Sequence, residues 1–191
     1  MIEKQIIEGL KNKDENIFKF LVEKYKDKVY NTVLSILQNA EDAEDIAQEV
    51  FIQVYTSINN FRGNSSLSTW IYRISITKSF EKIRFKKRKK RFAFLINLFN
   101  KKNETIEIPD FYHPGVILEQ KENSKILFQA IENLNEKQKK TYILHNIEGL
   151  SYKKISKITG LSIASIESLI HRAKKKLKLE IIKLIGNERN L

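Results

Sequence analysis

The sequence predicts an all-α protein of two small helical domains joined by a linker, and three observations predict it. Apolar residues recur at the i, i+3, i+4 spacing of amphipathic helices over most of the 191 residues. This periodicity stops over residues 92–116, which contain both prolines of the chain. Charge is also unevenly placed: residues 1–60 hold 7 basic and 11 acidic side chains, whereas residues 61–103 hold 13 and 1. We therefore expect one domain over residues 1–91 and another over residues 117–191.

The composition indicates a basic protein of the cytoplasm. A formal net charge of +12 predicts contacts with a polyanion. Because the chain contains no cysteine, we expect neither disulfides nor thiolate metal sites. The N-terminal stretch lacks the apolar run of a signal peptide, and no stretch approaches the ~20 apolar residues that span a bilayer. We therefore expect a soluble cytoplasmic protein without membrane insertion.

Two amphipathic helices are expected at the start of the first domain. Asp14 is placed to cap the first helix, whose apolar positions run from Ile17 to Leu37. Asn39 is placed to cap the second, which carries an apolar stripe formed by Ala43, Ile46, Ala47, Val50, Phe51, Val54 and Ile58. On the opposite face we expect a row of carboxylates, spaced i, i+3 and i+7: Asp42, Asp45 and Glu49.

A loop and a third helix complete the first domain. Asn, Gly and Ser residues predict a loop over residues 59–66. The third helix is expected over residues 67–85, and the basic run KKRKKR follows it at residues 86–91. The linker begins with the apolar octet FAFLINLF, residues 92–99, for which we expect a helix packed on either domain or on a partner rather than a membrane-surface segment.

The second domain ends in a helix-turn-helix pattern. A capping box, NEKQ, precedes the pattern at residues 135–138. Within LSYKKISKITGLSIASIESLIHRAKKKLK, the small Ser156 is followed by Gly160 four positions later and by Ile166 six positions after that. The small side chain permits close helix crossing, the glycine forms the turn and the aliphatic side chain fills the angle. A helical hairpin with a lysine-rich outer face is the alternative, but caps, glycine and core residues all agree with the helix-turn-helix spacing.

The second helix of such a motif enters the major groove of DNA, with its N-terminal half at the base edges. We expect its exposed positions to contact DNA: Ser162, Ala164, Ser165, Glu167, Ser168, His171, Arg172, Lys174 and Lys175.

Two blocks of the chain resemble a known family. DAEDIAQEVFIQVYTSINNFRGNSSLSTWIYRIS is similar to region 2 of bacterial sigma factors of the extracytoplasmic-function (ECF) group, and LNEKQKKTYILHNIEGLSYKKISKITGLSIASIESLIHRAKKKL is similar to region 4. The resemblance implies a subunit that directs core RNA polymerase to specific promoters and initiates DNA-templated transcription. It implies no catalytic residues, metal, cofactor or small-molecule substrate. It also implies an anti-sigma partner and a free chain that can fold closed.

The resemblance implies three binding sites. The acidic helix docks on the clamp helices of the polymerase β′ subunit, and the implied residues are Asp42, Asp45, Gln48, Glu49 and Phe51. Region 4 contacts the β flap and, through the exposed positions of its second helix, the −35 promoter element. Region 2 captures the −10 element as it melts, with a base flipped into a pocket near the loop. The residues implied there are Arg62, Asn64, Ser65, Ser66, Trp70, Tyr72, Arg73, Lys78, Lys82, Arg84, Lys86 and Lys87.

Some positions depart from the family pattern, and two other functions stay open. Thr77 and Glu81 stand where many relatives have Asn and Asp, and Glu167 and Leu169 stand at commonly basic positions, so the preferred −35 sequence is open. One alternative function is a stand-alone helix-turn-helix regulator that acts as a homodimer, which leaves the acidic helix without a role. Another is a metal-dependent nucleic-acid enzyme that uses the three carboxylates, but the three histidines of the chain show no ligand spacing.

Overall fold

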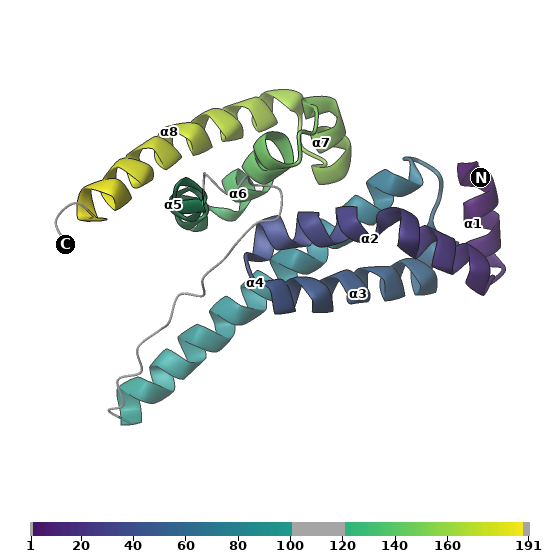
Figure 1. Ribbon diagram of the computed structural model, residues 1–191, viewed down its shortest axis with the longest axis horizontal. Helices are drawn as coiled ribbons and strands as arrows, with labels where there is room; N and C mark the ends of the chain where they lie inside the picture. The colour runs from purple at the N-terminus through teal and green to yellow at the C-terminus, as the bar shows by residue number, and fades with distance from the viewer. Residues whose placement is uncertain (1, 101–120, 189–191) are drawn as a thin grey trace.

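The computed structural model describes residues 2–100 and 121–188, and every regular element in these two ranges is a helix. Because these elements are all helices, the predicted all-α class is confirmed. Figure 1 shows that the helices form two lobes. The first lobe contains α1 (Glu3–Lys11), α2 (Glu15–Leu37), α3 (Ala40–Ser57), a 3-10 turn (Ile58–Asn60) and α4 (Leu67–Asn100). The second contains α5 (Lys121–Glu132), α6 (Glu136–Tyr142), a π-helical turn (Ile143–Ile147), α7 (Tyr152–Thr159) and α8 (Ile163–Glu188).

The first lobe is organised by two side-chain caps that the sequence predicted. The Asp14 carboxylate accepts hydrogen bonds from the amides of Asn16 and Ile17, at 2.9 and 3.2 Å, and so begins α2. The Asn39 side chain accepts a hydrogen bond of 2.8 Å from the amide of Asp42 and begins α3. The resulting helices bury one core, which includes Leu21, Val33, Leu34, Ala43, Ile46, Val50, Val54 and Ile71.

Helix α1 is an element that we did not expect from the sequence. Its buried residues, Ile6 and Leu10, are four positions apart and close the core of the first lobe from one end. A Cβ atom on Gly9 would lie 2.6 Å from the side chain of Ile17, so only glycine permits this approach of α1 to α2. The signal available in the sequence was the short apolar repeat within an otherwise charged segment.

Helix α4 is longer than expected. It continues to Asn100, nine residues past the boundary expected at residue 91, so the helix expected for the octet 92–99 is present as the end of α4 rather than as a separate element. The reason is local, because no glycine or proline interrupts residues 67–100. What the side chains of this octet pack against lies outside the described part of the structure. The remaining linker residues, 101–116, and the first residues expected in the second domain, 117–120, lie outside the described part of the chain.

The second lobe follows the predicted motif closely. Asn135 and Gln138 form the capping box, with each side chain accepting a hydrogen bond from the other residue's amide. Ser151 caps α7. Gly160 ends α7 in the left-handed region, with a φ of 75°, and α8 follows after two residues. The helix-turn-helix prediction is therefore confirmed.

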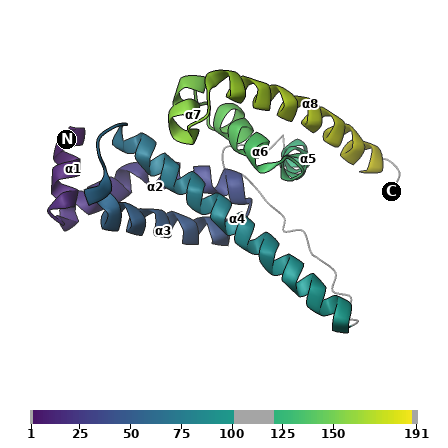
Figure 2. The same cartoon turned by 180° about the vertical axis from the view of Figure 1, so that it is seen from behind.

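The two lobes share a core. In both cartoon views the second lobe lies against the side of the first that carries α2 and α4 (Figures 1 and 2). Ile36 of α2 and Tyr72, Ile76 and Phe80 of α4 belong to the same buried cluster as the apolar residues of α5 to α8. The free chain is therefore closed, a question that the sequence left open.

Candidate functional site

One face of α3 presents an exposed acidic surface. Asp45, Gln48 and Glu49 are exposed, as expected. Ile52, at the next turn of the same face, is 62% exposed, and our sequence reasoning missed it because it stands off the core stripe. Asp42 and Phe51 are only 9% and 7% exposed, so these two predicted contact residues lie at the buried edge of the face.

Asp42 is held by two lysines of α4. Its carboxylate lies 3.2 Å from Nζ of Lys82 and also accepts a hydrogen bond from Lys86. Burial opposes ionisation of this carboxyl group, but the two lysines outweigh it and lower the pKa of Asp42 below its ordinary value. Two further pairs follow along the same helices: Glu49 lies 2.8 Å from Lys78, and Asp45 lies 4.0 Å from Lys82.

The loop before α4 forms an open pocket of about 190 Å³. Gly63, with a φ of 72°, turns the chain there. The half-buried Trp70 forms an aromatic wall together with Phe61, at 5.2 Å between ring centroids. The residues that line the pocket are Asn60, Phe61, Arg62, Asn64, Ser65, Trp70 and Arg73. The structure thus brings together five of the residues predicted to bind the −10 element, and adds Asn60 and Phe61.

Ser66 is not part of this lining. Its hydroxyl oxygen accepts a hydrogen bond of 3.2 Å from the amide of Thr69 and so caps the first turn of α4. The amide of Leu67 is satisfied from α1, because the Glu3 carboxylate accepts its hydrogen bond at 3.0 Å. Two residues therefore fix the point at which the loop enters the helix.

The other −10 residues predicted along α4 are placed in different ways. Tyr72 is 5% exposed under the second lobe. Arg73 donates to the main-chain carbonyl of Lys157 in α7, and Arg84 forms an ion pair of 3.1 Å with Glu136. The lysines at positions 78, 82 and 86 pair with the α3 carboxylates, while Lys87 forms no ion pair with the described residues.

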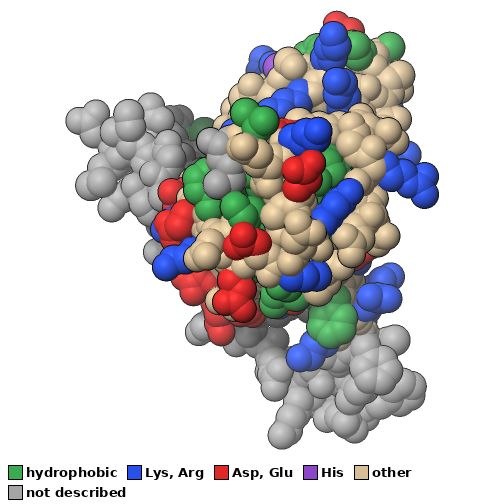
Figure 3. All heavy atoms as spheres, turned by 90° about the vertical axis from the view of Figure 1, so that its right-hand side faces the viewer, with side chains coloured by type: hydrophobic (Ala, Val, Ile, Leu, Met, Phe, Trp, Pro, Cys, Tyr) green, Lys and Arg blue, Asp and Glu red, His purple; other side chains and the backbone are tan. Residues whose placement is uncertain are grey.

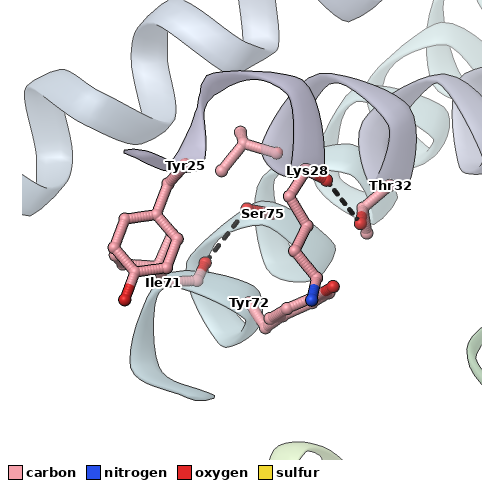
Figure 4. A pocket seen from close by; sticks show the side chains of 7 residues that line it. Tyr25, Lys28, Thr32, Ile71, Tyr72 and Ser75 are labelled. Atoms are coloured by element: carbon pink, nitrogen blue, oxygen red, sulfur yellow. Dashed lines mark hydrogen bonds between the residues drawn. The ribbon is translucent and has the colours of Figure 1, made fainter. Parts of the chain in front are cut away.

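A small cavity lies between α2 and α4 of the first lobe. It has a volume of about 10 Å³, room for about one water molecule. In Figure 4 the Lys28 side chain extends to the ring of Tyr72, with 5.5 Å between its ammonium nitrogen and the ring centroid. Burial raises the pKa of Tyr72 to about 12, and the charge of Glu148 adds to the shift. The lining residues are Tyr25, Lys28, Val29, Thr32, Ile71, Tyr72 and Ser75.

Glu148 joins the lobes at this place. Its carboxylate accepts hydrogen bonds from the hydroxyl groups of Thr32 and Ser35 of α2, at 2.9 and 3.2 Å. Burial raises the pKa of Glu148, although the two hydroxyl groups and the nearby Lys28 oppose the shift.

The predicted DNA-contact positions of the helix-turn-helix all lie exposed on one side of the second lobe. They are Ser162, Ala164, Ser165, Glu167, Ser168, His171, Arg172, Lys174 and Lys175. Leu169 is only 7% exposed, so the departure from a basic residue at this position serves packing. The closed arrangement therefore leaves this helix accessible while it covers Tyr72 and engages Arg73 in the first lobe.

Charge is also segregated on the molecular surface. Figure 3 shows acidic side chains gathered at the lower left of one face, with lysine and arginine side chains over the upper part and the right. Among the described residues, no group of three or more His, Asp or Glu side chains could hold a metal ion. Within the same ranges, none of the helices has the length and apolar character that crossing a membrane requires.

Comparison with known proteins agrees with the resemblance. Residues 21–89 match the family model of sigma-70 region 2, and residues 124–177 match that of sigma-70 region 4. The chain is 30% identical over 184 residues to the ECF RNA polymerase sigma factor SigW of Bacillus subtilis, covering 95% of this chain and 97% of that protein. It is 27% identical over 189 residues to the ECF RNA polymerase sigma-E factor of Escherichia coli K12, covering 94% of each.

Solved structures show the same fold. CnrH, in complex with the cytosolic domain of CnrY, gives a TM-score of 0.64 at 16% identity and covers 93% of this chain and 95% of its own. The sigma factor RpoE of Bartonella quintana, in complex with the anti-sigma factor NepR, gives 0.63 at 21% identity, covering 87% and 96%. These matches do not favour a stand-alone dimeric regulator. Because relatives named as ECF sigma factors match nearly the whole chain and regions 2 and 4 occur in order, the chain belongs to the ECF RNA polymerase sigma factor family.

Proposed function

We propose that α3 binds the β′ clamp helices of core RNA polymerase through Asp45, Gln48 and Glu49, with Ile52 as the apolar contact. The observation that carries this proposal is that all four side chains are exposed on one face of α3. Carboxylates that meet basic clamp residues give orientation and fast association, and the apolar side chain adds affinity. Asp42 and Phe51 support this face from its buried edge.

The pocket before α4 is the proposed site for a base extruded from the melted −10 element. Arg62, Asn64 and Ser65 offer polar groups to a base edge, and Trp70 forms an apolar wall. Extrusion costs a few kcal/mol, which pocket contacts and backbone charge along α4 offset. Basic side chains along α4 are proposed to contact the phosphates of the −10 strand: Lys78, Lys82, Arg84, Lys86 and Lys87. The affinity for −10 DNA should therefore fall steeply as the salt concentration rises.

The exposed face of α8 is the proposed contact with the −35 element. The β flap of the polymerase is the proposed partner that holds the second lobe over the −35 element while the first lobe binds the −10 element. Its charged side chains there are Arg172, Lys174, Lys175 and Glu167, and His171 lies among them. Tyr72 becomes available to −10 DNA, and the guanidinium of Arg73 is released from the carbonyl of Lys157, only when the second lobe leaves α4. In this proposal core polymerase therefore separates the lobes. The proposed location is the cytoplasm, where transcription takes place.

An anti-sigma protein is the proposed cellular inhibitor. The solved complex of RpoE with the anti-sigma factor NepR, whose sigma subunit has a similar fold, supports this. Such a protein would hold the lobes in the closed arrangement. Purification of the tagged chain from its own cells should yield polymerase subunits or a protein of this kind.

Charge reversal tests the proposed function. A chain with Asp45→Lys and Glu49→Lys should bind core polymerase at least tenfold more weakly and lose promoter-dependent initiation. Glu23→Lys is the matched control, because Glu23 is an exposed acid on another helix, α2, where it pairs with Lys26. Equal binding by the reversed chain and the control would refute the proposal, and so would failure of the unmodified chain to direct core polymerase to any promoter.

A further inference from the structure

The residues proposed for two different partners are bonded to each other in the free chain. Four ion pairs join α3 to α4: Glu49–Lys78, Asp45–Lys82, Asp42–Lys82 and Asp42–Lys86. As the residue number falls along α3 it rises along α4, so the carboxylates and the lysines form two antiparallel rows. We call this set the α3–α4 ion-pair ladder.

The two ends of the ladder differ in exposure. At one end, the side chains of Glu49 and Asp45 are 53% and 61% exposed, so an external cation can reach these carboxylates, whereas the lysines that pair with them are 20% and 27% exposed. Ion pairs with such an exposed partner are individually weak and easily exchanged. At the other end, the side chain of Asp42 is 12% exposed and is shared by two lysines. Breaking this partly desolvated end is more costly, so it keeps α3 and α4 together while the outer pairs exchange.

From this arrangement we propose that the ladder couples polymerase binding to DNA binding. A cationic residue of the polymerase that reaches Glu49 displaces Lys78, which then becomes free to bind phosphates. One that reaches Asp45 loosens Lys82, which keeps its shorter pair with Asp42 until DNA takes it up. This inference rests on the proposed function of α3 and α4. Such coupling is reciprocal. DNA that binds the lysines also leaves the carboxylates free, and so raises the affinity of the chain for polymerase.

The inference makes an unusual prediction: removing a DNA-binding lysine should improve binding to polymerase. In Lys78→Gln, Glu49 no longer has an internal cation to lose, and the same holds for Asp45 in Lys82→Gln. We expect each variant to bind core polymerase two- to fivefold more tightly than the unmodified chain. Lys87→Gln is the matched control, because it removes the same charge from the same helix and Lys87 forms no ion pair with the described residues.

The experiment measures two affinities for each full-length variant. Equilibrium titration of the labelled chain with core polymerase gives the first, and titration of the assembled holoenzyme with a single-stranded −10 oligonucleotide gives the second. All three variants should bind the oligonucleotide more weakly, but only Lys78→Gln and Lys82→Gln should bind core more tightly. Thermal unfolding of each variant verifies that the chain remains folded.

Two results would overturn the inference. The first is unchanged or weaker core binding by Lys78→Gln and Lys82→Gln, and the second is an equal gain in core affinity by Lys87→Gln. Either result would mean that the ladder does not compete with polymerase for the carboxylates. Failure of the proposed function looks different, because the unmodified chain would then not bind core at all, or would bind it equally well after reversal of Asp45 and Glu49.

Discussion

The guanidinium of Arg73 donates to the main-chain carbonyl of Lys157, 84 residues further along the chain, with 2.9 Å between Nε and the oxygen. Lys157 lies in the last turn of α7, where carbonyl groups lack helical partners and the helix dipole favours a cation. Arg73 also lines the pocket before α4. The same side chain therefore belongs to the closure of the lobes and to the proposed −10 site.

Replacing Arg73 by Ala should loosen the second lobe. A hydrogen bond from an exposed charged group contributes about 1 kcal/mol or less, so hydrogen exchange in α7 should accelerate up to about fivefold. Exchange in α3 should not change. Arg62→Ala is the control, since Arg62 lines the same pocket from the loop. Equal acceleration in both variants would mean that Arg73 does not hold the lobe.

The stability of the closed chain should depend on Glu148 and on pH. Burial raises the pKa of Glu148 above its ordinary value of 4.5, so the closed state binds its proton more tightly than the unfolded state does. The stabilisation from this group is fully present below pH 4.5 and is lost as the pH rises through the raised pKa. The groups that face it are Thr32, Ser35, Lys28 and Tyr72.

Glu148→Gln isolates this contribution. The neutral amide can still bond the two hydroxyl groups of α2, so the variant should match or exceed the unmodified chain in thermal stability at pH 7. As the pH falls toward 4.5, the difference between the two unfolding temperatures should shrink or reverse. If both proteins respond to pH in parallel, burial of this carboxylate has no role in closure.

Glu3 should stabilise the start of α4. Its carboxylate accepts the hydrogen bond from the Leu67 amide, and a negative charge there also favours the helix dipole. Loss of such a cap costs about 0.5–2 kcal/mol. We expect Glu3→Ala to lower the free energy of unfolding by about this amount in urea, and to alter the fluorescence of Trp70, the only tryptophan of the chain.

Glu8→Ala provides the comparison for Glu3→Ala. Glu8 lies on the same helix, but its exposed side chain only faces Lys4 at 4.0 Å. This variant should be close to the unmodified chain in both measurements. A similar loss in both variants would assign the effect to α1 as a whole rather than to the cap.

Local rules account for the parts of the fold that the sequence predicted correctly. Asp14, Asn39, Ser151 and the Asn135–Gln138 pair cap their helices because a short polar side chain reaches an amide two or three residues away. Such contacts need no knowledge of the rest of the chain. The same holds for the periodicity that placed the buried face of α3.

What the sequence did not predict depends on contacts between distant segments. Asp42 and Lys86 are 44 residues apart, and Thr32 and Glu148 are 116 apart. Spacing along one helix placed Asp42 among the exposed acids, but α4 covers it with lysines. The sequence pattern of α4 cannot distinguish the positions proposed to bind DNA from those that close the lobes, because Arg73 belongs to both sets.

Gly160 should be difficult to replace, for a reason of backbone conformation alone. Its φ is 75°, and no atom lies within 4 Å of an added Cβ, so Gly160→Ala meets conformational strain and no clash. The strain costs about 1–2 kcal/mol. Gly160→Asn should recover part of the loss, since Asn tolerates this region better. Thermal denaturation of the three proteins tests this order, and equal stability of all three would contradict it.

Glu167 should limit the affinity of α8 for duplex DNA. It is exposed one helical turn before His171 and two before Lys174 on the same face of α8, where a negative charge repels phosphates. Glu167→Gln removes the repulsion, and Glu167→Lys adds a phosphate contact. Both should bind −35 duplex more tightly in the holoenzyme, but only the lysine variant should steepen the dependence of log K on log salt, by about 0.9.

Because a phosphate contact carries no sequence information, the gain should be nearly equal on specific and nonspecific duplexes. A gain confined to one sequence would instead place residue 167 at a base edge, and no gain from either variant would mean that this face of α8 does not meet DNA.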